Sequence, residues 1–350
     1  QTWGYEVHRG LATTGVVGTL RRGQGSKRLG LRADMDALPI HEANDLPHCS
    51  VHAGVMHACG HDGHSAMLMA AAQYIAQEVE FSGTLNLIFQ PAEESLGGAR
   101  KMMGDGLFER FPCDAIFAMH NMPGFRQGQL LLREGATMAS SENILVHIEG
   151  KGGHGAMPHL SADPLVAGSA IVMALQTIVS RNVPPLQMAV ITVGSFQSGV
   201  ANNVIPQNAT LKLSVRALDR GVRDLLRKRI VEVVELQAQS YGVTAQVEFL
   251  PGYPVLVNTP AETALAREVA VALVGADNVV LQTEPLTASE DFAYMLDAVP
   301  GSYLFIGNGD ASTGGHGACM VHNPGYDFND DNIAIGAAYW TLLAERFLTD

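Results

Sequence analysis

Three short apolar runs in the first part of the chain each end in polar residues, with helical patterns between them. The runs lie within 31–40, at 85–89 and at 115–119, and the helical patterns lie at 64–78 and around 97–110. This alternation is typical of an α/β sheet. Ligands of such sheets bind outside the carboxyl ends of the strands. We therefore expect the side chains near these strand ends to converge at one edge: Cys59, Glu93, Glu94 and His120.

The middle of the chain follows a different pattern. Residues 141–150 alternate apolar and polar side chains, as a half-solvated antiparallel strand does. A helical pattern (163–181), two strands (188–196 and 209–218), a helix (about 221–240) and a strand (246–254) follow. This β-α-β-β-α-β order is typical of a ferredoxin-like sandwich. We expect residues 141–254 to form a smaller domain, inserted into a larger one made of 1–140 and 255–350.

Composition excludes several classes of protein. With 350 residues, 47% hydrophobic and 16% charged, the chain suits a compact two-domain enzyme. A net charge of −13 argues against a nucleic-acid partner. Four widely spaced cysteines without a CxxC pair favour reduced thiols and a cytoplasmic location. We see no apolar run of about 18 residues and hence expect no membrane span. No signal peptide is recognisable, and strand-like sequence directly after Gln1 suggests that upstream residues are missing.

Residues 56–67 carry an unusual density of metal-binding side chains. His57, Cys59 and His61 alternate, so they share one side of an extended segment. His61 and His64 share a face if a helix begins there. A strand-to-helix junction with imidazole and thiolate donors suits a divalent metal, although a polar turn with stray histidines is the plainer alternative.

Further donors enlarge this set. Of the adjacent Glu93 and Glu94, one could bind metal while the other takes a proton from water. With Cys59, His61, His120 and His322, the chain offers one thiolate, one carboxylate and three imidazoles. Five donors exceed what one tetrahedral zinc needs, so a two-metal centre uses them better. An acidic loop and buried structural histidines are the alternatives.

Eight motifs carry a resemblance to a known family: RADMDALPI, HACGHDGH, FQPAEE, AMHN, GKGGHGAMPH, NNVIP, TASEDFAYM and HNPGYDFND. In this order the chain resembles the metallo-amidohydrolases that include aminoacylases, hippurate hydrolases and plant auxin-conjugate hydrolases. They are part of a wider aminoacylase and carboxypeptidase G group. The resemblance implies an α/β central-sheet catalytic domain with two metals and an inserted ferredoxin-like α+β lid or dimerisation domain. It maps the general base onto Glu93, and the metal ligands onto Cys59, His61, Glu94, His120 and His322.

The chain departs from the wider group at two places. Related branches carry His-x-Asp where this chain has Asp34-Met35-Asp36, and Cys59 makes up for the missing imidazole. We therefore expect Asp36 to orient a ligand rather than to bind metal. The helix bearing His-x-x-Pro-Glu with which family members usually begin is absent. The remaining histidines of the motifs, which a five-ligand site does not need, we expect in loops or behind the ligands: His57, His64, His159 and His316.

The resemblance also assigns roles within the inserted domain. It implies that His154 reaches the active site of the partner subunit of a homodimer and stabilises the oxyanion. Asn203 and Arg216 are similar to family residues that hold substrate, and an arginine can clamp a carboxylate. A surface loop histidine and a surface salt bridge are the plainer interpretations of His154 and Arg216.

The expected reaction is hydrolysis of the amide bond of N-acyl amino acids, acetyl or aroyl as in hippurate, with two divalent ions (Mn, Zn, Ni or Co) per subunit. A metallo-dipeptidase or an N-carbamoyl amino acid hydrolase on the same scaffold is the main alternative. A non-catalytic metal-binding or ligand-carrier protein is a third, disfavoured because Glu93, Glu94 and His154 are all present.

Overall fold

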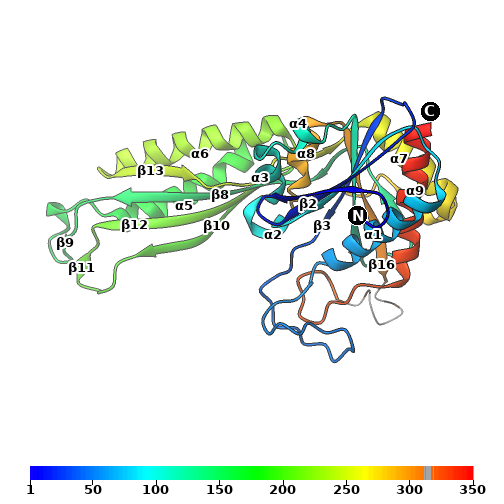
Figure 1. Cartoon of the computed structure of the whole chain (residues 1–350). Helices are drawn as coiled ribbons and strands as arrows, with labels where there is room; N and C mark the ends of the chain where they lie inside the picture. The colour runs from blue at the N-terminus through cyan, green and yellow to red at the C-terminus, as the bar shows by residue number, and fades with distance from the viewer. Residues whose placement is uncertain (311, 313–316, 318, 350) are drawn as a thin grey trace. The chain divides into compact units, whose positions relative to one another are not determined.

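The chain divides into two compact units in the computed structural model, which describes residues 1–310, 312, 317 and 319–349. Unit 1 comprises Gln1–Thr137, Val257–Glu284 and Asp291–Asp350, and unit 2 comprises Met138–Leu256 and Pro285–Glu290 (Figure 1). The sequence boundaries after 140 and 254 lie close to these. The sequence patterns missed that Pro285–Glu290 leaves unit 1, because this short segment pairs with unit 2 through the Met138–Leu286 bridge.

Unit 1 is built on an eight-stranded mixed sheet of order β1-β2-β4-β3-β5-β16-β6-β15. The strands are β1 (Glu6–Leu11), β2 (Gly15–Arg22), β3 (Arg28–Asp34), β4 (Gly83–Gln90), β5 (Ala115–Pro123), β6 (Leu130–Leu132), β15 (Val279–Leu281) and β16 (Gly301–Gly309). The four central strands β4, β3, β5 and β16 run parallel. Their carboxyl ends therefore meet at one edge, as the sequence predicts.

Helices pack on this sheet through one large apolar core. Strand β3 directs Leu29, Leu31 and Ala33 into the core that contains residues of α1, α7 and α9. Because strand side chains alternate, Arg32 and Asp34 point to the other face, where Arg32 lies against the first residue of α8. The helices of unit 1 are α1 (His61–Glu78), α2 (Glu93–Leu96), α3 (Gly98–Gly104), α4 (Leu107–Arg110), α7 (Pro260–Val274), η2 (Ala276–Asn278), α8 (Phe292–Ala298) and α9 (Asp331–Thr349).

Two details of unit 1 differ from the sequence prediction. The helix expected around 97–110 is broken into α3 and α4, because Gly106 adopts a left-handed φ of 89° between them. The short strands β7 (Gly135–Met138) and β14 (Leu256–Asn258), which pair with each other near the passages between units, carry too few residues for a recognisable pattern.

Unit 2 has the predicted ferredoxin-like sandwich. Its antiparallel sheet has the order β10-β12-β8-β13 (Figure 1). The elements are β8 (Ser140–Glu149), β9 (Gly153–His154), η1 (Pro158–Leu160), α5 (Pro164–Asn182), β10 (Ala189–Ser198), β11 (Val204–Ile205), β12 (Asn208–Ala217), α6 (Arg220–Ser240) and β13 (Thr244–Phe249). Helix α5 begins as expected: the Asp163 carboxylate accepts from the backbone N–H of Leu165, and Pro164 occupies the first turn.

Helix α5 is apolar on more than its buried face. Ala167, Ile171 and Leu175 pack into the core of unit 2, whereas Met173 is exposed. Of the helices described, α5 alone has the length and composition that a membrane span requires, a test that core helices of soluble proteins also pass. The sequence prediction of no such stretch overlooked it because a threonine, serines and a glutamine interrupt the apolar residues.

Candidate metal centre

The five predicted donors come from four segments of unit 1. His61 is the first residue of α1, and Cys59 lies two residues before it. Glu94 is on α2, directly after β4, and His120 lies near the carboxyl end of β5. His322 lies in the loop between β16 and α9. The parallel strands thus explain why donors more than 200 positions apart in the chain meet.

The donor atoms of these side chains lie within reach of common ions. Cys59 Sγ is 3.4 Å from His120 Nε2. Glu94 Oε1 is 3.2 Å from His322 Nε2 and 3.8 Å from His61 Nε2. Cys59, Glu94 and His322 form one group whose ligand atoms all lie within 4.8 Å of one another, and His61 with both glutamates forms another. The two groups share Glu94, as neighbouring sites with a common ligand would.

Two buried atoms in this cluster have no hydrogen-bond partner among the described residues: His61 Nε2 and Glu94 Oε1. Glu94 Oε1 lies within ion-pair distance of the His61 and His322 imidazoles. Unsatisfied buried polar atoms are costly, and metal coordination would satisfy both. The donor set therefore fits divalent ions, with thiolate and imidazole favouring zinc, nickel or cobalt and the carboxylate admitting manganese.

In two of the predicted histidine ligands, a contact to Nδ1 orients Nε2 toward the metal centre. His120 Nδ1 donates to the Asn121 carbonyl at 2.7 Å, which leaves Nε2 facing Cys59. His61 Nδ1 lies 3.3 Å from Asp36 Oδ1, which leaves its Nε2 facing Asp34 and Glu94. Asp36 Oδ2 also accepts from the backbone N–H of Glu94 at 3.1 Å. Asp36 thus contacts two of the predicted ligands, His61 and Glu94, as a group that orients ligands would.

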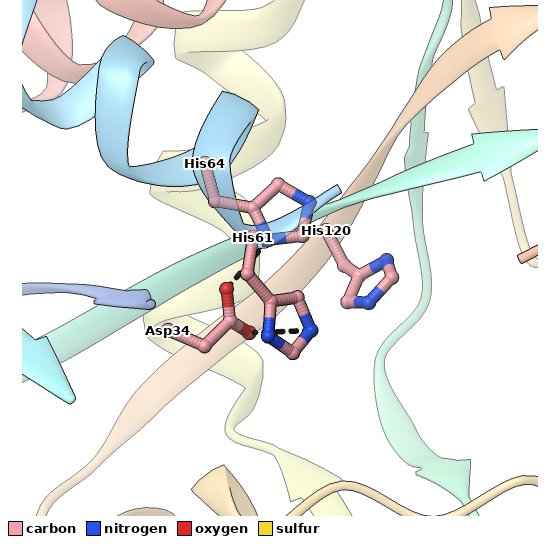
Figure 2. A group of neighbouring side chains, drawn as sticks. All are labelled: Asp34, His61, His64 and His120. Carbon is pink, nitrogen blue, oxygen red and sulfur yellow. Dashed lines mark hydrogen bonds and ion pairs between the residues drawn. The ribbon is translucent and has the colours of Figure 1, made fainter. Parts of the chain in front are cut away.

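His64 lies in the same cluster, but both of its ring nitrogens already have hydrogen-bond partners (Figure 2). Its Nε2 accepts from the backbone N–H of Asn121 at 2.9 Å, so the proton is on Nδ1, which donates to Asp34 Oδ1 at 2.6 Å. Asp34 is engaged as well, because its Oδ2 accepts from Arg32 Nη1 at 2.8 Å. Both ring nitrogens of His64 therefore have hydrogen-bond partners, and each oxygen of Asp34 already accepts one hydrogen bond.

Burial and carboxylates set opposing electrostatics in this cluster. Burial opposes the charge of His61, but Asp34, Asp36 and Glu94 outweigh it and raise its pKa to about 9. Burial lowers the pKa of both His64 and His120 to about 4, which keeps them neutral. Burial, followed by the charges of Glu94 and Glu93, raises the pKa of the Cys59 thiol. The carboxylates that favour a proton on His61 also favour a bound cation, and a divalent ion held by His61 and Cys59 would displace the protons on His61 Nε2 and on the thiol.

Two residues at the centre have left-handed backbones. His322 has φ 66°, a conformation that costs a residue with a Cβ about 1 kcal/mol or more and that often marks functional positions. Gly60, between Cys59 and His61, has φ 81°. A Cβ on Gly60 would lie 2.4 Å from Asn121 Nδ2 and 2.5 Å from the Tyr326 hydroxyl. Only glycine therefore lets the backbone approach this closely.

The residues expected to touch substrate lie in unit 2. His154 and Asn203 are exposed neighbours: His154 pairs with Val204 in the β9–β11 ribbon, and Gly155 N–H donates to the Asn203 carbonyl at 2.8 Å. Arg216 is half-buried near the far end of β12, where its Nη1 donates to Ser289 Oγ at 3.0 Å. Asn208 begins β12 at the end of the strand that lies toward β9 and β11, and Arg216 lies eight residues, roughly 26 Å, further along it. One small substrate therefore cannot touch both Arg216 and the His154–Asn203 pair of the same subunit.

The remaining histidines of the motifs are diverse. His57 is half-buried and His159 is exposed, whereas His316 lies outside the described residues. Sequence reasoning gave no role to several buried polar residues around the centre: Arg32, Asp34, Asn121, Asp291 and Tyr326. The signal that could have found the first two is a charged pair inside the apolar strand RLGLRAD, since charged residues are rarely fully buried without partners.

Known proteins resemble this chain over almost its whole length. Hippurate hydrolase of Campylobacter jejuni is 44% identical over 346 residues, which cover 99% of this chain and 88% of that protein. N-acetyl-L-cysteine deacetylase of Bacillus subtilis is 38% identical over 348 residues, covering 99% and 80%. A crystal structure described as a dinuclear metal binding peptidase from the M20 family, of Bacillus subtilis, superposes with a TM-score of 0.83 at 30% identity, covering 99% of this chain and 89% of that one.

The family model described as peptidase family M20/M25/M40 matches residues 30–346. This match includes all five predicted donors and residues of both units. The chain therefore belongs to peptidase family M20/M25/M40 and is a metal-dependent hydrolase of that family.

Proposed function

We propose that this chain is a binuclear metal-dependent amidohydrolase that cleaves N-acyl amino acids of the hippurate type into a carboxylic acid and a free amino acid. The carrying observation is the donor cluster itself, where His61 Nε2 and Glu94 Oε1 lie buried beside Glu93 and have no hydrogen-bond partner in the part of the chain that the structure describes. The names of the two curated relatives, a hippurate hydrolase and an N-acetylcysteine deacetylase, support an N-acyl amino acid as substrate.

In this proposal Cys59, His61, Glu94, His120 and His322 hold two divalent ions, with Mn, Zn, Ni and Co as the candidates. Bound ions supply Lewis acidity, which polarises the amide carbonyl and promotes ionisation of the attacking water. The protein's own contribution is to fix the donors: Asp36 holds His61 and the backbone of Glu94, and the Asn121 carbonyl holds His120.

Glu93 is the proposed general base. It is 7% exposed, lies among the ligand atoms of His61 and Glu94, and its Oε1 accepts from the backbone N–H of Asp291 at 3.2 Å. That hydrogen bond orients the carboxylate. Glu93 takes the proton of the attacking water and passes it to the leaving nitrogen as the C–N bond breaks, so the amino acid leaves as an amine.

We assign substrate recognition to residues of unit 2 from both subunits of a dimer. Arg216 suits the carboxylate of the amino-acid half, because a guanidinium can bind a carboxylate through two hydrogen bonds. His154 and Asn203 lie at the other end of β12 from Arg216, which favours the role expected from the family, contact with the site of a partner subunit. There His154 would donate to the oxyanion of the tetrahedral intermediate.

Exposed apolar residues of unit 2 support a homodimer. Strand β10 is an edge of its sheet, and an unpaired edge is a template for pairing with a second copy. Phe196 and Val190 on this strand and Met173 on α5 are exposed. Sedimentation should give a dimer, and a stable, fully active monomer would exclude the trans role of His154. For location we propose the cytoplasm, which suits four free cysteines.

The test uses chelated protein reloaded separately with Mn, Zn, Ni or Co, with release of glycine from hippurate as the readout. Dipeptides and N-carbamoyl amino acids are assayed in parallel, and preference for either would replace the N-acyl assignment with the corresponding alternative. Adjacent glutamates give a matched pair of variants. We expect Glu93→Gln to abolish turnover with metal content intact, and Glu94→Gln to lose metal. A Glu93→Gln enzyme with most of its activity would exclude Glu93 as the base.

A further inference from the structure

Arg32 carries a fully buried charge and has no part in the metal binding, proton transfer or substrate recognition proposed for this chain. Its side chain is 1% exposed on β3, and its guanidinium lies 5.6 Å from the ring centroid of Phe292. Removing a guanidinium from water is costly unless its donors are satisfied by charged or polar partners. The partners of Arg32 therefore indicate its role.

One branch of the guanidinium supports the donor cluster. Arg32 Nη1 donates to Asp34 Oδ2 at 2.8 Å. Asp34 Oδ1 in turn accepts from His64 at 2.6 Å, and Asp34 Oδ2 lies 3.7 Å from His61 Nε2 (Figure 2). His64 also accepts from the backbone N–H of Asn121, whose side chain donates to the Cys59 carbonyl at 2.6 Å. Through Asp34, Arg32 thus fixes the surroundings of two predicted ligands.

The other branch supports the proposed base. Arg32 Nη2 donates to Asp291 Oδ1 at 3.2 Å, and Arg32 Nε donates to Gln90 Oε1 at 2.9 Å. Gln90 Nε2 donates to both oxygens of Asp291, at 2.8 and 2.9 Å. Ala99 N–H donates to Asp291 Oδ2 at 2.8 Å. Both carboxylate oxygens of Asp291 thus accept hydrogen bonds, and its backbone N–H donates to Glu93 Oε1.

We propose that Arg32 is a positioning residue that holds the metal ligands and the general base Glu93 in one fixed arrangement. The inference rests on the proposed function for the role of Glu93. Three guanidinium nitrogens point in three fixed directions, to the end of β3, the end of β4 and the start of α8. A lysine carries the same charge on one atom and cannot make this planar fork.

A merely structural ion pair would also destabilise the fold when broken, so stability alone does not test the proposal. Arg32→Lys keeps the charge and removes the geometry. We expect cobalt affinity, measured by competition with a chelator, to fall by about tenfold, the usual size for groups that orient ligands. We expect kcat on hippurate at saturating cobalt to fall by about ten- to a hundredfold with KM unchanged, since Arg32 does not reach the substrate.

Arg28→Lys is the matched control. Arg28 lies on the same strand and donates to Asp114 from Nε and Nη2, but at the surface. This variant should match the wild type in cobalt affinity and kcat. If Arg32→Lys fails to fold, Asp291→Asn keeps the shape and the backbone donor while removing the charge that Arg32 holds, and the same losses are expected of it.

Loss of both cobalt affinity and kcat in folded protein supports the inference. Lowered melting temperature with both quantities unchanged overturns it, as does loss of one without the other, because the proposal is a single unit that serves both. A wild-type protein that binds cobalt but hydrolyses no N-acyl amino acid would instead overturn the proposed function. In that case the cobalt affinity of Arg32→Lys alone decides the inference.

Discussion

Substitution of Gly60 by alanine is the sharpest test of the geometry around the metal centre. The left-handed backbone of Gly60 costs alanine about 1 kcal/mol. The added Cβ would also lie 2.4 Å from Asn121 Nδ2 and 2.5 Å from the Tyr326 hydroxyl, so both must move. Both atoms take part in buried hydrogen bonds, from Tyr326 to Asn121 and from Asn121 to the Cys59 carbonyl. Forced repacking of this kind costs about 1–3 kcal/mol.

We therefore expect Gly60→Ala to lower the free energy of unfolding of metal-free protein by roughly 2–4 kcal/mol, measured by urea denaturation. Gly124→Ala is the control, because Gly124 has φ 94° in the same unit but nothing within 4 Å of an added Cβ. It should show only the backbone cost of about 1 kcal/mol. Because Asn121, which must move, holds the Cys59 carbonyl, cobalt affinity should fall in Gly60→Ala alone. Equal losses of stability in the two variants, with equal cobalt affinity, would refute the reasoning.

Two further predictions concern the same cluster. In metal-free protein His64 and His120 have a pKa of about 4 when folded, against 6.5 when unfolded. Between pH 4 and 6.5 the unfolded chain therefore binds more protons than the folded chain. Stability should thus fall as pH drops from 6.5 to 4, by on the order of 3 kcal/mol for each histidine; a flat urea midpoint over this range would contradict it. Tyr326→Phe should cost about 1–3 kcal/mol by leaving Asn121 Oδ1 unpaired, and should weaken cobalt binding. Tyr339→Phe, which removes a buried bond to the Ala266 carbonyl, should lower stability only, and equal cobalt affinity in both tyrosine variants would argue against the Asn121 link.

Local patterns were sufficient for much of the fold. The long helices and the ferredoxin-like order of unit 2 were predicted because their periodicity extends over ten or more residues, as in Arg220–Ser240. Short pieces were missed for the opposite reason: β9, with two residues, has no period at all. The passage of Pro285–Glu290 into unit 2 depends on pairing with a strand about 150 positions earlier, which no local pattern records.

The sequence by itself determined the chemistry that this protein can offer: the donor types, their place at strand ends, and the family that its motifs resemble. Those features depend on residue identity and spacing within short segments. Only the tertiary structure decided which histidine is occupied and which is available. His64 and His61 are three positions apart on one helix. Asn121 and Asp34 engage both ring nitrogens of His64, whereas Nε2 of His61 has no hydrogen-bond partner among the described residues. The same holds for Arg32, whose contact with Asp291 joins residues 259 positions apart. Such partners are chosen by the packing of the folded chain, because a buried polar group must find its partner wherever the fold places one.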